Sequence, residues 1–358
     1  MSGDATVGII ANPMAGRDVR RLVARATNLT PETKRDQVAR AAIGAAAAGA
    51  SRILVCAEPF RISSSAVENL DVGAEIEVLD VGAKLDAGDS ARAALAMREA
   101  GSAALVVLGG DGTNRAIAKA CPELPLVPIS TGTNNVFPTP LEATLAGGAA
   151  GLIASGRIHR DEVAQRSKIV RVQIDAGVDA GGEDLALVDV VKLVGDRVGS
   201  LLPFDPDKIR EVALARAEPA AIGISPIGGL LCPCGADDSF GVAVSCLASG
   251  DHGNSEGVRS LLVPISPGLY RTVQIASFRR LELGESIRWM GPGVLALDGD
   301  REYTLQADQA SSLRVVREGP WVVDVGRALV LAAERGLYLD RGPWRDALDA
   351  AGSAPDCC

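Results

Sequence analysis

The chain has 358 residues, of which 47% are hydrophobic and only 3% aromatic, so it is long enough for about two domains with aliphatic cores. Its formal net charge of −9 argues against a general nucleic-acid binder and against binding to an anionic membrane surface. No segment reaches the ~20 uninterrupted apolar residues needed to cross a bilayer, and we recognise no signal peptide, so we expect a cytoplasmic protein without membrane or nucleic-acid partners.

Strand and helix patterns alternate over the first part of the chain, which predicts a Rossmann-like parallel sheet with crossover helices over residues 1–158. Ligand-binding loops of such a sheet follow the carboxyl ends of its strands. The expected strands are Thr6–Ala11, Arg52–Ala57, Glu75–Leu79, Leu105–Leu108 and Leu126–Ile129. The expected helices are a segment ending near Val23, Glu32–Ala50, Ala87–Ala100 and Thr113–Ala120.

Short alternating stretches divided by Gly, Pro and Asp turns follow after about residue 160, and they predict a C-terminal β-rich domain over residues 159–318. A helix is predicted over Val322–Arg335, in a segment 319–350 that packs back on one of the domains, and residues 351–358 are expected to be a disordered tail. The expected strands are Ile169–Ile174, Gly241–Leu247, Leu261–Ile265, Thr272–Ala276, Ser286–Met290, Gly293–Leu297 and Ser312–Val316.

A glycine-rich loop carries most of the functional information. The apolar strand Leu105–Leu108 runs directly into Gly-Gly-Asp-Gly-Thr at 109–113. Glycines let backbone N–H groups approach a ligand, and the following helix N-terminus attracts an anion. A carboxylate among phosphates is repelled unless it takes a proton from an attacking hydroxyl or holds a metal. We therefore predict phosphoryl transfer with Asp111 as the catalytic carboxylate, against the alternative of a capping Asp in a simple turn.

Two more loops follow predicted strands at the same edge of the sheet, one after Ala11 and one after Ile129. Asn-Pro is also a common turn, Arg17 could be a solvated side chain, and the polar residues after Ile129 could cap a helix. The predicted nucleotide- and phosphate-binding residues are Asn12, Gly16, Arg17, Gly109, Gly110, Gly112, Thr113, Asn114, Thr131, Gly132, Thr133, Asn134 and Asn135.

The motif at 109–113 resembles the signature shared by NAD kinases and the diacylglycerol/sphingosine lipid kinases. Leu262–Leu269 is similar to the Pro-Ile-x-Pro segment of NAD kinases, Leu297–Asp300 to their Asp-Gly-Gln element, and Leu187–Val191 to their Leu-Asn-Glu/Asp-Val-Val segment. Ile10–Ala24 and Thr131–Pro138 resemble a bacterial branch, the ATP-NAD kinase-like proteins of acetoin catabolism.

The resemblance implies an NAD kinase-like fold with ATP and Mg²⁺ bound between two domains and the NAD 2′-OH as acceptor, giving NADP. By analogy it also implies a homo-oligomer. The residues expected on the substrate side are Asp189, Ser225, Asp298 and Asp300. Asp189 lies in an apolar strand, which either a ligand or an ion pair with a residue such as Lys192 would explain.

Two departures from the family pattern leave the acceptor open. Val188 stands where NAD kinases have an Asn, and residues 222–229 replace their Gly-Ser-Thr-Ala-Tyr element without a tyrosine. The alternatives are a kinase of another small hydroxyl metabolite, a lipid kinase, or a catalytically inactive nucleotide sensor.

The metal ligands stay unknown: Asp298 and Asp300 lie near Gly299 in an expected hairpin turn, where structure alone explains them and a metal or phosphate role is the lesser alternative. Seven irregularly spaced cysteines predict reduced thiols. Cys232 and Cys234 either lie by chance in one turn or form a metal-binding or redox-active thiol site.

Overall fold

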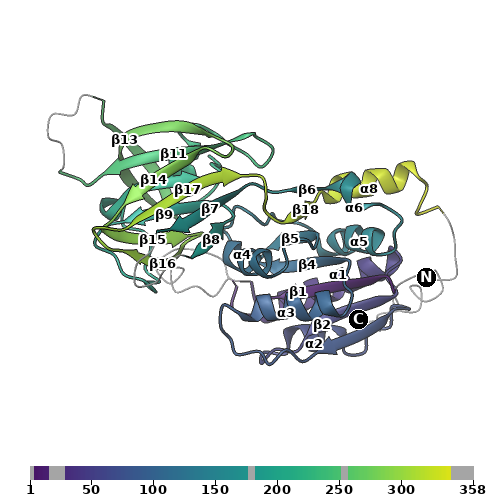
Figure 1. Cartoon of the computed structure of the whole chain (residues 1–358). Helices are drawn as coiled ribbons and strands as arrows, with labels where there is room; N and C mark the ends of the chain where they lie inside the picture. The colour runs from purple at the N-terminus through teal and green to yellow at the C-terminus, as the bar shows by residue number, and fades with distance from the viewer. Residues whose placement is uncertain (1–3, 16–28, 176–181, 251–256, 340–358) are drawn as a thin grey trace.

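The computed structural model describes residues 4–15, 29–175, 182–250 and 257–339. Figure 1 shows two lobes side by side, a sheet-and-helix lobe built mainly from the N-terminal part and a β-rich lobe. In the first lobe, five neighbouring strands are parallel, in the order β3-β2-β1-β4-β5, so the predicted α/β fold class is confirmed. Their bounds are β1 Thr6–Ala11, β2 Arg52–Cys56, β3 Glu75–Leu79, β4 Ala104–Gly109 and β5 Leu126–Ser130.

Helices cover both faces of this sheet. On one face α1 (Pro31–Ala47), α2 (Ile62–Val67) and α5 (Ala143–Ala154) share an apolar core with the strands, and on the other face lie α3 (Asp89–Glu99) and α4 (Asp111–Ala120). The α1–α5 contact is close because it is made of small residues. A Cβ on Gly147 would come within 2.0 Å of the Ala41 carbonyl oxygen, so only glycine fits there. This close packing explains how a chain so poor in aromatic residues builds a core.

The second lobe is a sandwich of two antiparallel sheets, ordered β12-β13-β11-β10-β9-β15-β16 and β14-β17-β7-β8. Apolar side chains of both sheets, such as Val190, Leu295 and Leu313, form the core between them. The strands are β7 Ile169–Ile174, β8 Glu183–Ala186, β9 Asp189–Leu193, β10 Ile209–Leu214, β11 Phe240–Leu247, β12 Arg259–Ser266, β13 Leu269–Glu282, β14 Ser286–Met290, β15 Gly293–Leu297, β16 Asp300–Leu305 and β17 Ala310–Val316. Two short helices, η2 (Pro206–Lys208) and α7 (Ser225–Gly229), lie in its connections.

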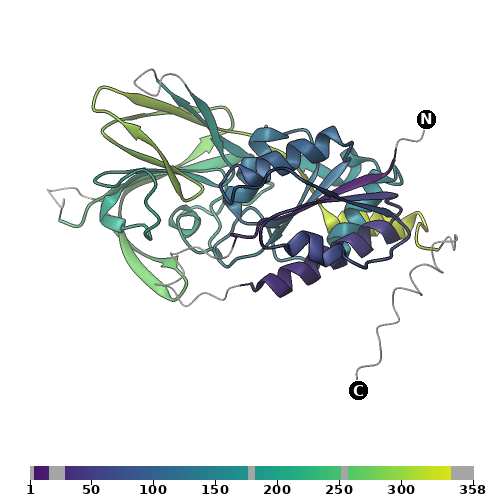
Figure 2. The same cartoon turned by 90° about the horizontal axis from the view of Figure 1, so that it is seen from below.

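The chain returns to the first lobe at its C-terminal end, as Figure 2 also shows from below. After α6 (Arg160–Val163), β6 (Ala164–Arg166) joins the first sheet beside β18 (Trp321–Val323), and α8 (Val325–Glu334) contacts α5. The prediction of a helix from Val322 is therefore wrong at its start. Residues 321–323 pair as a strand, and Asp324 caps the helix by accepting a hydrogen bond from the Arg327 N–H.

Other elements differ from the sequence expectations. β13 is far longer than the predicted Thr272–Ala276, and α2, α5, β8 and β10 were not predicted. The predicted helix that ends near Val23 lies outside the described residues. Within the described ranges, no helix combines the length and apolar character that a membrane crossing requires.

Candidate active site

The glycine-rich loop joins β4 to α4 in a tightly packed turn. Gly110 precedes the helix in an extended conformation, and Asp111 begins it. A Cβ on Gly109 would lie 2.5 Å from Thr113 Cγ2, and one on Gly110 would lie 2.8 Å from Asn135 Oδ1. A side chain at either position would therefore displace its neighbours. The first N–H groups of α4 have no intrahelical acceptor and are available to an anion.

The loop opens into a cavity of about 500 Å³ where the two lobes meet. Its walls come from the carboxyl ends of the β1, β4 and β5 strands on one side and from the β-rich lobe on the other. The predicted site residues on its walls are Asn12, Gly110, Asp111, Gly112, Thr113, Thr131, Asn134, Asn135, Asp189, Ser225, Asp298 and Asp300. The structure thus brings together residues from both lobes that lie far apart in the sequence.

Asp111 is held by the loop that follows β5. Its Oδ1 accepts a hydrogen bond from the Phe137 N–H at 2.8 Å, and both carboxylate oxygens lie 3.2 Å from the Val136 nitrogen. Burial and the nearby Asp298 raise the pKa of Asp111 to about 7, although these N–H groups act in the opposite direction. Near neutral pH, this carboxylate can therefore both take up and release a proton.

Asp298 lies in a hairpin turn, as the sequence predicts, and its structural role depends on partners that are distant in sequence. Its carboxylate accepts hydrogen bonds from the backbone N–H groups of Leu187, Val188 and Asp189, at 2.7, 2.8 and 3.2 Å. Its φ of +47° lies in the left-handed region, which fits its place in the turn between β15 and β16. Asp298 thereby fixes the start of β9 and points Asp189 at the cavity.

Asp189 is buried, and its Oδ1 has no hydrogen-bond partner among the described residues. Burial, followed by the neighbouring Asp298 and Asp111, raises its pKa well above the ordinary value. The expected alternative of an ion pair with Lys192 is wrong, because the Lys192 ammonium donates to the Met290 carbonyl at 2.5 Å. A buried acid without a partner needs an explanation, and a ligand supplies one.

Hydrogen bonds from Asn12 and Lys34 hold the loop after β1 in place. Asn12 Nδ2 donates to Thr113 Oγ1 at 2.8 Å, and Asn12 Oδ1 accepts from the Met14 N–H at 2.8 Å. The fully buried Lys34 donates to the carbonyl oxygens of Asn12, Pro13 and Ala15 at 3.0, 3.0 and 2.6 Å. Sequence reasoning missed Lys34, because nothing marks it within an alanine-rich helix. Gly16 and Arg17 lie outside the described residues.

The loop after β5 does not cap a helix, since the next helix, α5, begins only at Ala143. Thr131 lines the cavity with a buried hydroxyl that has no partner among the described residues. Asn135 donates to Ser130 Oγ at 2.8 Å, which orders the loop. The predicted residues that do not reach the cavity wall are Gly109, Asn114, Gly132 and Thr133.

Two residues of the β-rich lobe differ in role from the sequence interpretation. Ser225 lines the cavity, but its hydroxyl donates to the Arg216 carbonyl and accepts from the Glu218 N–H, both at 2.9 Å. Val188 packs in an apolar cluster with Phe137 and does not reach the cavity wall. Val188 therefore does not stand in for a substrate-binding amide, and an Asn there would be buried among apolar side chains.

Arg115, in α4, forms ion pairs and a hydrogen bond with the β-rich lobe. Its guanidinium contacts Asp184 at 2.8 Å and Glu302 at 2.9 Å, and its Nε donates to the Leu185 carbonyl at 2.7 Å. The buried Asp184 also pairs with Lys119 at 2.8 Å. This buried network was not predicted from the sequence, and it fixes the start of α4 relative to the second lobe.

We tested whether Mg²⁺ would fit side chains of the site. Among the described residues, no group of three or more His, Cys, Asp or Glu side chains is arranged to hold a metal ion. Both oxygens of Asp111 already face backbone N–H groups. The side chains of the described residues therefore do not form a Mg²⁺ site by themselves.

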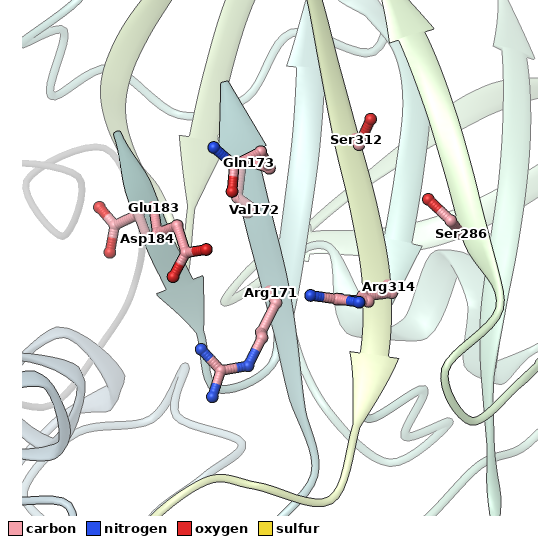
Figure 3. A pocket seen from close by; sticks show the side chains of 8 residues that line it. All are labelled: Arg171, Val172, Gln173, Glu183, Asp184, Ser286, Ser312 and Arg314. Atoms are coloured by element: carbon pink, nitrogen blue, oxygen red, sulfur yellow. The ribbon is translucent and has the colours of Figure 1, made fainter. Parts of the chain in front are cut away.

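The described cysteines, with Cys232 and Cys234 among them, are free thiols. Cys234 Sγ lies 3.0 Å from the buried Lys168 ammonium, and burial raises the pKa of Cys234. A separate hollow of about 220 Å³ lies on the four-stranded sheet. Figure 3 shows the side chains that line it. Arg171 and Arg314 lie opposite each other there, and none of the predicted site residues lines this hollow.

Comparisons with known proteins agree with this architecture. Residues 7–158 match the family model of the ATP-NAD kinase N-terminal domain, and residues 168–318 match that of the acetoin catabolism protein X C-terminal domain. The chain is 37% identical over 310 residues to acetoin catabolism protein X of Cupriavidus necator, covering 84% of this chain and 85% of that protein. A crystal structure of yeast NADH kinase complexed with NADH aligns with a TM-score of 0.51 and 11% identity over 94% of this chain and 89% of the yeast chain.

Proposed function

The chain belongs to the acetoin catabolism protein X family of NAD kinase-like proteins, and from this membership and the site geometry we propose that it is a nucleotide-dependent kinase with a hydroxyl acceptor. The fold and the N-terminal family model indicate a kinase-type protein. One observation supports the chemistry most strongly. A carboxylate with a pKa of about 7 stands at the N-terminus of α4, on the wall of a cavity between the lobes.

In the proposed reaction, ATP enters with Mg²⁺, and its terminal phosphates lie against the N-terminus of α4. The N–H groups of Gly112 and Thr113 would bind phosphate oxygens. Asp111 would accept the proton of the acceptor hydroxyl while that oxygen bonds to the γ-phosphorus and the bond to the β-phosphate oxygen breaks, releasing ADP. The pKa of Asp111 suits this exchange, because an acid that titrates near 7 can accept a proton at neutral pH.

The nucleoside of ATP would lie beyond the phosphates, along the carboxyl ends of β1, β2 and β3. A small pocket of about 40 Å³, which admits only part of a nucleoside, adjoins the cavity there, and the two share Asn12, Met14 and Ser90. Its walls are mainly apolar, with Ile10 and Val81 among the lining residues, as a flat aromatic base requires. This arrangement leaves the part of the cavity next to the β-rich lobe for the acceptor.

NAD is the acceptor that the family resemblance implies, and it is the first one to test. The full chain is incubated with ATP, Mg²⁺ and NAD, and NADP and ADP are measured separately. ADP that forms only when an acceptor is present supports a kinase. Tight ATP binding without transfer to any hydroxyl compound would instead support a nucleotide sensor. A requirement for lipid vesicles would support a lipid kinase.

A further inference from the structure

Two residues on the walls of the cavity, one from each lobe, have a buried polar atom without a partner among the described residues. Asp189 is 7% exposed, lines the cavity, and its Oδ1 has no partner among the described residues. Thr131, 1% exposed, lines the same cavity with an equally unpartnered hydroxyl. Because leaving a buried polar atom unpaired costs about 1–3 kcal/mol, two such atoms on one cavity point to a bound polar compound.

The acceptor side also carries a group of apolar side chains, beside the polar Ser225, Ser266, Asp298 and Asp300. The apolar side chains come from the segment before η2, from the segment before α7 and from the end of β12. Apolar wall residues exclude a compound that is hydrophilic all round, since its hydroxyls would lose water without gaining partners. The apolar lining residues are Leu201, Pro203, Phe204, Ile222, Ile224 and Ile265.

The charge of the cavity excludes another class of acceptor. Four carboxylates line it, those of Asp111, Asp189, Asp298 and Asp300, and the described lining includes neither lysine nor arginine. The phosphates of ATP would have the α4 N-terminus and Mg²⁺ as counterparts, but a second anionic group on the acceptor would have no lysine or arginine among the described lining residues. Burial and the neighbouring Asp298 and Asp111 raise the pKa of Asp189, which favours the uncharged form of this side chain.

The volume of the cavity also favours a small acceptor. Pockets for drug-sized ligands span roughly 300–1,000 Å³. The cavity of about 500 Å³ must hold the phosphates of ATP as well as the acceptor. A small acceptor fits beside the phosphates in a cavity of this volume.

From these observations, and resting on the proposed kinase function, we infer that the acceptor is a small uncharged diol or hydroxyketone with an apolar body rather than NAD. One oxygen of this compound lies at Asp111 and is phosphorylated, while Asp189 holds the second oxygen. The γ-phosphoryl group moves to the first oxygen, the hydroxyl proton moves to Asp111, and ADP leaves. Asp189 takes no part in the bond changes and acts in acceptor binding.

The test uses the full chain with ATP and Mg²⁺ and compares ethylene glycol, propylene glycol and NAD as acceptors. The two glycols differ by one methyl group, which an apolar pocket distinguishes by about tenfold or more in kcat/KM. We expect propylene glycol to exceed ethylene glycol by this factor and to exceed NAD. Phosphorus NMR identifies the product. Replacing Leu201, which is 53% exposed, by Ser should reduce the preference for propylene glycol without loss of folding.

Two variants of Asp189 test whether this side chain binds the acceptor through neutral hydrogen bonds or through its charge. Asp189→Asn keeps one donor and one acceptor, so the KM for propylene glycol should stay within about threefold, whereas Asp189→Ala should raise it by about tenfold or more. The affinity for ATP should not change in either variant.

A higher kcat/KM for NAD than for propylene glycol, or ATP binding without transfer to either glycol, overturns this inference. Transfer to NAD would still leave the proposed kinase function standing. Absence of ATP binding would refute the proposed function itself.

Discussion

The pH dependence of stability in an Asp111→Asn variant tests the electrostatics of the site. The pKa of Asp111 rises from 3.8 to about 7 on folding, which corresponds to about 4 kcal/mol at 1.36 kcal/mol per pH unit. Because the pKa is raised, the folded protein binds the proton more tightly than the unfolded chain does. The wild-type protein therefore loses this stability as pH rises from about 4 to about 7, and the variant does not.

The Asp111→Asn substitution also removes a hydrogen bond. The amide can accept from the Phe137 N–H, but the Val136 N–H then faces its NH₂ group, and an unsatisfied donor costs about 1–3 kcal/mol. We therefore expect the variant to be less stable than wild type by about 1–3 kcal/mol near pH 4 and more stable by a similar amount near pH 8. The two stability curves should cross between about pH 4.5 and 6.

The measurement is urea unfolding of both proteins from about pH 4 to about pH 8, with Asp308→Asn as a control. Asp308 is exposed, and no hydrogen bond or ion pair joins it to the described residues, so its replacement should shift stability little at any pH. A difference between Asp111→Asn and wild type that does not change with pH would refute the raised pKa. It would also remove the physical basis for proton transfer to Asp111.

Three further predictions concern the loop and its support. Arg115→Met should lower the free energy of unfolding by about 3–5 kcal/mol in a urea titration, because it leaves Asp184 short of its buried partner; an unchanged midpoint would contradict the network. Gly110→Ala should weaken ATP binding by about tenfold in calorimetry, since its Cβ would meet Asn135 Oδ1 at 2.8 Å, whereas Gly182→Ala, with open space around it, should bind ATP normally. Finally, kcat should rise with pH through about 7 as Asp111 ionises, and a flat profile would argue against its role as a base.

Sequence reasoning reached the parallel sheet and the glycine-rich loop because both have local signals. Apolar runs mark the strands, and the Gly-Gly-Asp-Gly-Thr motif directly follows one of them. It missed α5, whose glycines and alanines show no amphipathic pattern, since the helix is buried nearly all round.

The supporting residues of the site could not be predicted for a different reason. Lys34, Arg115 and Asp184 act through partners that are distant in sequence, with Arg115 and Asp184 separated by 69 positions. Lysine, arginine and aspartate are usually solvated surface residues, so the residue type alone does not predict these buried contacts. Only the folded chain shows that Asp298 orients the loop at Asp189 and that Val188 packs away from the cavity.

The most direct test of the account is the rate of phosphoryl transfer from ATP in wild type and Asp111→Asn, with a saturating hydroxyl acceptor and equal nucleotide occupancy. We predict that the variant binds ATP with unchanged affinity and transfers the phosphoryl group roughly 10²–10⁴-fold more slowly, as expected for loss of a general base. Equal transfer rates in the two proteins would contradict the central claim that Asp111 takes part in the chemical step.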